Sequence, residues 1–288
     1  MEEIKKILVL GSGGLIGHKI YLHLKNNPKF KLYSLSKSTK IDNKTIIHDV
    51  SNFKKLKSLI KKIEPNYIIN CIGLLIKDSE NDKLKSILLN ALLPNKLYSF
   101  SKKNKYKLIH LSTDCVFSGN NKKPYLETDI PDGTSNYSKT KSLGEINEID
   151  ALTIRTSIVG PQLKDGSELF HWFMKQNGEI FGYKNAYWSG ITTLELAKGV
   201  EWLILNNING IYHLTNGKKI SKYHLLNLFK KFTKKTVNIN PQLDFKTDKS
   251  FVDSRKEIDY QIPTYKTMIK NMINDIKSNK ILYSHYDI

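Results

Sequence analysis

The sequence predicts an α/β fold in which a doubly wound parallel sheet is followed by a smaller C-terminal α+β lobe. Strand and helix patterns alternate through the first half of the chain, as they do in repeated strand–helix–strand units. A glycine-rich turn directly follows the first strand pattern. The 288 residues correspond to about two average domains. We therefore expect a first domain over residues 1–160 and a smaller lobe over 161–288, from which some segments return to the first domain.

The elements of the first domain follow from the spacing of apolar residues. Short apolar runs predict strands at 4–10, 30–35, 45–48, 67–70, 107–112 and 151–159. Helical spacing predicts helices at 15–25, at 53–63, at about 81–103 and from about 136 onward. Sheets of this type bind their ligands at the carboxyl ends of the strands, so we expect the functional site at that edge.

The pattern changes from about residue 160, where short helices alternate with brief strands. We expect helices at 169–176, 193–205, 222–231 and 265–278, and a strand at 210–214. The segment 238–251 is polar, and we expect it to be rich in loops.

The charge balance first suggests a polyanionic partner. Lys and Arg number 46 against 27 Asp and Glu, which gives +19. Arg, however, occurs only at Arg155 and Arg255, and proteins that read nucleic acids rely on Arg for bidentate contacts. We therefore expect no nucleic-acid partner. No apolar run reaches the roughly 18 residues of a membrane span, so no membrane partner is expected either.

The two cysteines, Cys71 and Cys115, suit a reducing compartment. The first residues contain only a short apolar run before the glycines, which is unlike a secretory signal. Both observations predict a cytoplasmic protein. The eight histidines are scattered without metal-binding spacing, so no metal site is expected.

The glycine turn is a candidate phosphate-binding loop. Gly11, Gly14 and Gly17 lie between the first strand and the first helix. Glycine lets phosphates approach the backbone, and the amides that begin the helix, at Leu15 and Ile16, favour negative charge. The alternative is a simple strand–helix connection. The position of the turn favours a Rossmann-type dinucleotide site.

The end of the second strand bears on the choice of cofactor. An NAD site usually has Asp or Glu there, whereas this chain has Ser36 and Lys37. A hydroxyl and a cation suit a 2′-phosphate, so we expect NADPH rather than NADH. Asp49, followed by Val50 after the third strand, is expected either to accept a bond from the adenine amino group or to cap the next helix.

Three side chains form a candidate catalytic group. Thr113 follows the fifth strand, and Tyr137 and Lys141 are four residues apart, so that they share a helix face. A free tyrosine titrates near ~10, and a nearby ammonium lowers that pKa. Tyr137 is then expected to protonate a substrate oxygen while hydride reaches the carbon. Lys141 is also a candidate to bind the nicotinamide ribose, and Thr113 to hold the carbonyl oxygen.

These motifs resemble the extended short-chain dehydrogenase/reductase superfamily, and more closely the dTDP-4-dehydrorhamnose reductase family. The likeness spans roughly residues 5 to 160 and is carried by Gly11-x-x-Gly14-x-x-Gly17, by Tyr137-x-x-x-Lys141, by residues 110–119 and by residues 124–129. The resemblance implies reduction of the 4-keto group of a nucleotide-linked 6-deoxysugar with NADPH, in surface-polysaccharide synthesis. It implies a nucleotide-sugar partner, and a homodimer is among the assemblies that it allows.

The resemblance also implies further site residues. The cofactor is expected to contact Cys71, Ile72 and Gly73 at a strand end and Asn90 behind the active site. The substrate is expected to contact Thr113, Asp114, Val116 and Trp188, and Lys222 and Arg255 are candidates for its diphosphate. Arg155-Thr156 matches a family run at the next strand end. Ser138, where the family usually has Gly, suggests a divergent branch.

Two other functions are compatible with these motifs. One is a nucleotide-sugar epimerase or dehydratase with tightly bound NAD, which Ser36 and Lys37 disfavour. The other is a non-catalytic NADP-binding regulatory subunit, since the β subunit of methionine adenosyltransferase resembles the same reductases. The complete set of Thr113, Tyr137 and Lys141 favours an enzyme.

Overall fold

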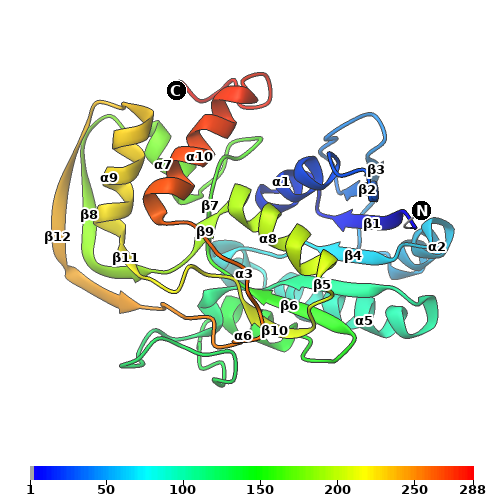
Figure 1. Ribbon diagram of the computed structural model, residues 1–288. Helices are drawn as coiled ribbons and strands as arrows, with labels where there is room; N and C mark the ends of the chain where they lie inside the picture. Colours follow the sequence, from blue (N-terminus) through cyan, green and yellow to red (C-terminus); the bar gives the residue numbers. More distant parts are fainter. Residues whose placement is uncertain (1–2) are drawn as a thin grey trace.

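Residues 3–288 are described by a computed structural model, and they form a large sheet, a smaller one and a short two-stranded pair (Figure 1). The larger has seven parallel strands in the order β10-β6-β5-β4-β1-β2-β3. Its strands are β1 (Lys5–Leu10), β2 (Phe30–Ser36), β3 (Ile46–Ile47), β4 (Tyr67–Asn70), β5 (Lys107–Leu111), β6 (Ala151–Arg155) and β10 (Gly210–His213). The predicted doubly wound parallel sheet is confirmed.

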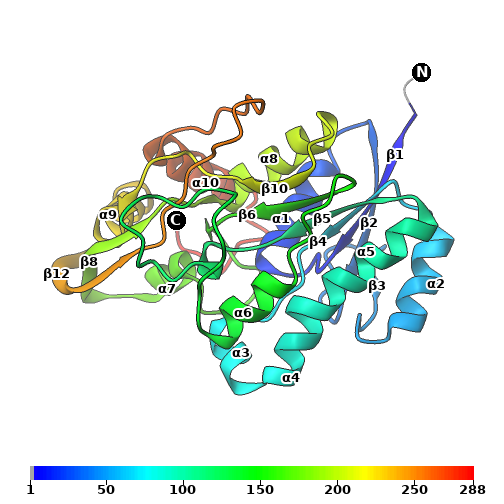
Figure 2. The same ribbon diagram turned by 90° about the horizontal axis from the view of Figure 1, so that it is seen from below.

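Helices cover both faces of this sheet (Figure 2). Alternate residues of a strand point to opposite faces, and β1 shows this directly. Ile7 and Val9 belong to a core with α1 (Leu15–Leu24) and α8 (Thr193–Leu205). Leu8 and Leu10 belong to a second core with α2 (Phe53–Ile63) and α5 (Leu93–Asn104).

The single helix predicted over residues 81–103 is wrong in detail, because the segment is broken into several pieces. These are α3 (Ile76–Asn81), α4 (Lys83–Ser86), a π-helical turn (Ile87–Leu92) and α5. Asp82 caps α4 by accepting a bond from the Lys85 amide. Pro94 has no N–H for the carbonyl of Asn90 four residues earlier, so the regular hydrogen-bond ladder cannot continue there.

The smaller sheet has three strands in the order β11-β8-β12, with β12 parallel and β11 antiparallel to β8. Its elements are α7 (Leu169–Lys175), β8 (Gly178–Trp188), β11 (Ile220–Ser221), α9 (Lys222–Thr233), β12 (Val237–Asp248) and α10 (Tyr265–Ser278). The expectation of loops over 238–251 is therefore wrong. Apolar residues at 237, 239, 243 and 245 alternate with polar ones, which is a strand pattern. Figure 1 shows β8 and β12 as a long arm beside α9.

Part of the C-terminal half returns to the large sheet. Strand β10 pairs with β6 in register Gly210↔Leu152, and α8 packs against α1. Strands β7 (Ile158–Val159) and β9 (Ile191–Thr192) form a short pair that joins the two parts. In residues 3–288, no helix has the length and apolar character needed to cross a bilayer.

Candidate active site

The glycine turn joins β1 to α1 and leaves no room for a side chain at Gly11, Gly13 or Gly17. Gly11 has a φ of +79°, a conformation that favours glycine. A Cβ at Gly17 would lie 2.2 Å from the Gly11 carbonyl oxygen. Helix α1 follows Gly14 without a side-chain cap, so the first-turn amides at Leu15 and Ile16 are suited to an anion.

Ser12, inside this turn, is a second indication of a ligand. Its side chain is fully buried, and its hydroxyl has no hydrogen-bond partner among residues 3–288. Buried polar atoms are rarely left without a partner. A phosphate oxygen at the turn would supply one, so the residues present fit a dinucleotide cofactor.

The end of β2 lies beside the glycine turn. A Cβ at Gly13 would be 2.9 Å from the Ser36 hydroxyl oxygen, which accepts a bond from the Thr39 amide at 3.1 Å. Lys37 Nζ lies 2.8 Å from a carboxylate oxygen of Asp49. The predicted 2′-phosphate contacts are thus next to the turn, but the Lys37 charge is already paired.

Asp49 has a different local role from the helix cap that we considered. Its carboxylate accepts bonds from the amide and the hydroxyl of Ser51, at 3.0 and 2.8 Å. Helix α2 is capped by Asn52, which accepts from the Lys55 amide. The bond from Lys37, followed by those from Ser51, holds the pKa of Asp49 well below its usual value. Val50, its neighbour, is buried in the core.

The end of β4 contacts both the glycine turn and the candidate catalytic lysine. A Cβ at Gly11 would lie 2.9 Å from an Ile72 side-chain carbon, and one at Gly73 would lie 3.8 Å from Lys141 Nζ. Cys71, between β4 and Ile72, is a free thiol whose pKa burial raises to about 12. The cofactor residues predicted at this strand end therefore do come together.

Asn90 organises the back of the site from the π-helical turn. Its side-chain oxygen accepts a bond from the Leu74 amide at 2.7 Å. Its amide group donates to the Ser86 hydroxyl at 3.2 Å and to the Thr140 hydroxyl at 3.3 Å. Asn90 is fully buried, so it positions the loop after β4 against α6 (Asn136–Leu143).

Thr113, Tyr137 and Lys141 meet at the carboxyl end of β5. The Thr113 hydroxyl donates to Asp114 at 3.1 Å and lies close enough to the Tyr137 phenol to affect its pKa. Lys141 is buried on α6, and its Nζ donates to the Leu111 carbonyl at 2.6 Å. The three side chains that the sequence singled out thus share one edge of the sheet.

Burial controls the protonation of this group. It raises the pKa of Tyr137 above the ordinary value, although the nearby Thr113 hydroxyl acts the other way. Burial lowers the pKa of Lys141 to about 8, and the charge of Glu145 opposes that shift. We expected Lys141 to lower the pKa of Tyr137. In the structure the Lys141 ammonium instead donates to the Leu111 carbonyl.

The predicted substrate residues differ in their burial and contacts. Asp114 lies in a short 3₁₀ turn beside Thr113, and Lys222, the first residue of α9, acts on it electrostatically. Val116 is fully buried in a small hydrophobic cluster that is separate from the main cores. Trp188 is 3% exposed, and its indole N–H donates to Ser157 at 2.9 Å. The substrate roles of Val116 and Trp188 therefore stay predictions.

Lys222 and Arg255, the two candidate diphosphate contacts, lie in different places. The Lys222 ammonium is 5.4 Å from the Trp188 ring centre, and burial lowers its pKa while Asp114 and Glu168 oppose the shift. Arg255 donates to Glu257 at 2.8 Å and to the carbonyls of Asn209 and Ile211 near the start of β10. Because parallel strands begin at the opposite edge from the active site, the expectation for Arg255 is wrong.

Sequence reasoning missed two acidic groups. Glu145 accepts bonds from Ser112 at 2.6 Å and from Nε and Nη2 of Arg155, at 2.9 and 2.7 Å. Glu168 caps α7, and burial raises its pKa to about 7. Glu145 ends the run from Tyr137 that resembles the reductase family, but the sequence alone assigns it no role, and Glu168 stands in no such run; only the packing shows where the two carboxylates lie.

Residues 5–277 match the family model described as the RmlD substrate binding domain. The chain belongs to this family. The RmlD-family chain is 24% identical over 227 residues to a dTDP-4-keto-6-deoxy-D-glucose reductase of Streptomyces niveus, covering 76% of this chain and 75% of that protein. It is 23% identical over 250 residues to the methionine adenosyltransferase 2 subunit beta of Bos taurus, covering 77% and 70%.

The RmlD fold is also found in a solved structure. A dTDP-4-dehydrorhamnose reductase from Bacillus anthracis, in complex with NADP, superimposes with a TM-score of 0.81 at 20% identity. The match covers 94% of this chain and 99% of that one. At this identity the likeness establishes the fold, which agrees with the arrangement of the large and small sheets described above.

Proposed function

We propose that this RmlD-family chain is a cytoplasmic reductase that uses NADPH to reduce the 4-keto group of a nucleotide-linked 6-deoxysugar. One observation carries the proposal. Thr113, Tyr137 and Lys141 meet at the carboxyl end of β5, and the Lys141 ammonium reaches the loop after β4 that also touches the glycine turn. This is where a doubly wound sheet binds its ligands.

The chemistry divides between these side chains. Bound NADPH would supply the hydride to the carbonyl carbon. Tyr137 keeps its proton at neutral pH, because burial raises its pKa, and would donate that proton to the carbonyl oxygen. The Thr113 hydroxyl would hold the same oxygen. The Lys141 ammonium would stabilise the phenolate left on Tyr137, once substrate and cofactor draw it from the Leu111 carbonyl.

Turnover with dTDP-4-dehydrorhamnose is the direct test. NADPH absorbance should fall in proportion to the added keto-sugar, and faster than with NADH. Absence of turnover, together with NAD released when the purified protein is denatured, would instead support an epimerase or dehydratase.

A second candidate is a regulatory subunit without turnover, which the likeness to the methionine adenosyltransferase 2 subunit beta favours. A stoichiometric protein partner recovered from the native cell, with no reduction of any keto-sugar tested, would support it. Turnover of a keto-sugar by the isolated chain would show that a regulatory role is not the whole function of the protein.

A further inference from the structure

The ring of His18 is hydrogen-bonded at both nitrogens, and the two bonds lead to different parts of the molecule. His18 lies in α1, directly after the last glycine of the turn, and its side chain is fully buried. Its Nδ1 lies 2.8 Å from the Gly14 carbonyl oxygen, and its Nε2 lies 2.8 Å from the hydroxyl of Tyr283. One side chain of α1 therefore joins the glycine turn to the C-terminal segment.

The chemistry of the two partners gives the direction of both bonds. A carbonyl oxygen can only accept, so Nδ1 carries the ring proton and donates it to Gly14. Burial lowers the pKa of His18 to about 4, so the ring is neutral at physiological pH and Nε2 carries no proton. Nε2 therefore accepts from the Tyr283 hydroxyl, and this bond stabilises the tautomer that the bond to Gly14 requires.

The Gly14 carbonyl belongs to the same peptide unit as the Leu15 amide. In a planar trans peptide the C=O and the N–H point in opposite directions, so a bond that holds one also holds the other. The Gly14 oxygen accepts from the backbone amide of His18 at 3.1 Å as well as from its ring. Both bonds aim the carbonyl along α1, and the Leu15 amide is then aimed at the anion expected at the glycine turn.

Tyr283 belongs to a C-terminal segment, red in Figure 1, that contacts both α1 and the smaller lobe. Its side chain is 1% exposed. Just before this segment, Asp275 of α10 forms an ion pair with Lys19 of α1. Three residues after Tyr283, the Tyr286 hydroxyl accepts from the Gln162 amide at 3.0 Å in the smaller lobe. The Tyr283 hydroxyl is thus held against His18 by contacts on either side of it.

We propose that Tyr283 is a positioning residue for the cofactor, which acts through His18 to aim the Leu15 amide at the diphosphate of NADPH. The inference rests on the proposed function, because it takes the glycine turn to hold that diphosphate. An amide that is already aimed at an anion loses little entropy when the anion binds, so the bond should appear in the affinity for NADPH. A tyrosine that only stabilised the fold would leave this affinity unchanged.

Fluorescence titration of the whole protein with NADPH tests the proposal in Tyr283→Phe, which removes only the hydroxyl. The dissociation constant for NADPH should rise about fivefold, since no bond then selects the tautomer of His18. Tyr286→Phe is the matched control, because it removes a buried hydroxyl of the same segment that is bonded to Gln162 and His171 instead. In thermal unfolding it should destabilise the protein to a similar extent, but it should change the affinity for NADPH less than about twofold.

His18→Phe removes both ring bonds and provides a second variant should Tyr283→Phe fail to fold. It should raise the dissociation constant for NADPH about tenfold or more, and adding Tyr283→Phe to it should cause no further loss, because Tyr283 acts through His18. The inference is overturned if Tyr283→Phe binds NADPH like the wild type or like Tyr286→Phe, or if the effects of the two substitutions add independently. A wild-type protein that binds no NADPH would overturn the proposed function together with this inference.

Discussion

Tyr137 and Lys141 differ in how burial affects them. Burial keeps the proton on the tyrosine, and it makes the lysine easier to deprotonate, with a pKa of about 8. Both residues favour their uncharged forms when water is excluded. The pair is therefore suited to donate a proton at neutral pH, but it depends on the lysine remaining charged.

This dependence predicts a pH profile. As pH rises through about 8, Lys141 loses its proton, so kcat/KM for keto-sugar reduction should fall on the alkaline side. Lys141→Met should lower kcat/KM by about 100-fold or more and remove that limb. Lys139→Met, at an exposed position on the same helix, is the control. A wild-type profile that stays flat to pH 10 would refute the assignment.

Glu145 and Arg155 form a buried pair behind Ser112. Their side chains are 6% and 2% exposed. Removing one member leaves an uncompensated buried charge, so Glu145→Gln should lower the free energy of unfolding by about 3–5 kcal/mol. Asp150→Asn breaks the half-exposed pair with Lys102 and should lower it by less than about 1 kcal/mol. Urea unfolding measures both, and equal effects would contradict this account.

At the scale of elements, the π-helical turn and α6 fit together through Gly144. A Cβ there would lie 1.9 Å from the Asn90 carbonyl oxygen, the carbonyl that Pro94 leaves without its helical partner. The glycine thus lets α6, which carries Tyr137 and Lys141, approach the turn that holds Asn90. The chemistry depends on this close contact between two helices.

Gly144→Ala should therefore destabilise the protein by about 1–3 kcal/mol and weaken the binding of NADPH, because the contact must open. Gly166→Ala is a matched change in an exposed loop, where the added methyl meets only the flexible Gln162 side chain. Thermal unfolding with and without NADPH measures both effects. An unchanged melting temperature in Gly144→Ala would show that the helices are not held this closely.

Some elements could be read from the sequence and others could not. The large sheet was predictable because its strands are continuous apolar runs separated by amphipathic helices. The break near Asn90 was not, because it arises from one missing amide at Pro94 and one close approach at Gly144. Strand β12 was missed because its exposed polar residues outweighed the alternating apolar ones.

At the scale of the whole molecule, the C-terminal segments brace the cofactor helix. The His18 ring and the Tyr283 hydroxyl are hydrogen-bonded at 2.8 Å, and Lys19 forms an ion pair with Asp275 of α10. Burial lowers the pKa of His18 to about 4, so its ring is neutral at physiological pH. The smaller lobe therefore contacts α1 directly through side chains. These contacts link it to the helix that follows the glycine turn.

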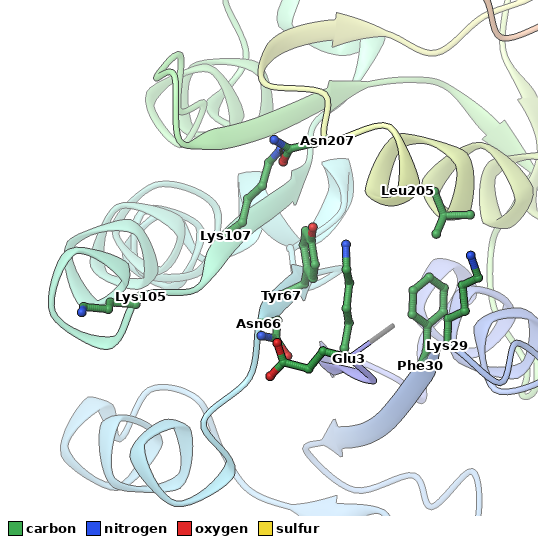
Figure 3. Close-up of a pocket in the computed structure, with 10 residues that line it drawn as sticks. Glu3, Lys29, Phe30, Asn66, Tyr67, Lys105, Lys107, Leu205 and Asn207 are labelled. Atoms are coloured by element: carbon green, nitrogen blue, oxygen red, sulfur yellow. Dashed lines mark hydrogen bonds between the residues drawn. The ribbon is translucent and has the colours of Figure 1, made fainter. Parts of the chain in front are cut away.

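The candidate site was predictable where neighbouring residues form a motif. Gly11, Tyr137 and Lys141 could be chosen from spacing. The pairing of Lys37 with Asp49, the contact of Lys222 with Trp188 and the burial of Val116 depend on contacts between different segments of the chain. The net charge of +19 has a similar limit, since the sequence does not reveal that Lys5, Lys29, Lys105 and Lys107 line one cavity at the amino ends of the parallel strands (Figure 3).

The central claim is that Tyr137 donates the proton in an NADPH-dependent reduction, and Tyr137→Phe tests it most directly. The measurement is the rate of NADPH oxidation with dTDP-4-dehydrorhamnose, beside the affinity for NADPH from fluorescence titration. We expect the rate to fall by about 100-fold or more while the affinity changes less than about threefold. A variant that retains the wild-type rate would contradict the account.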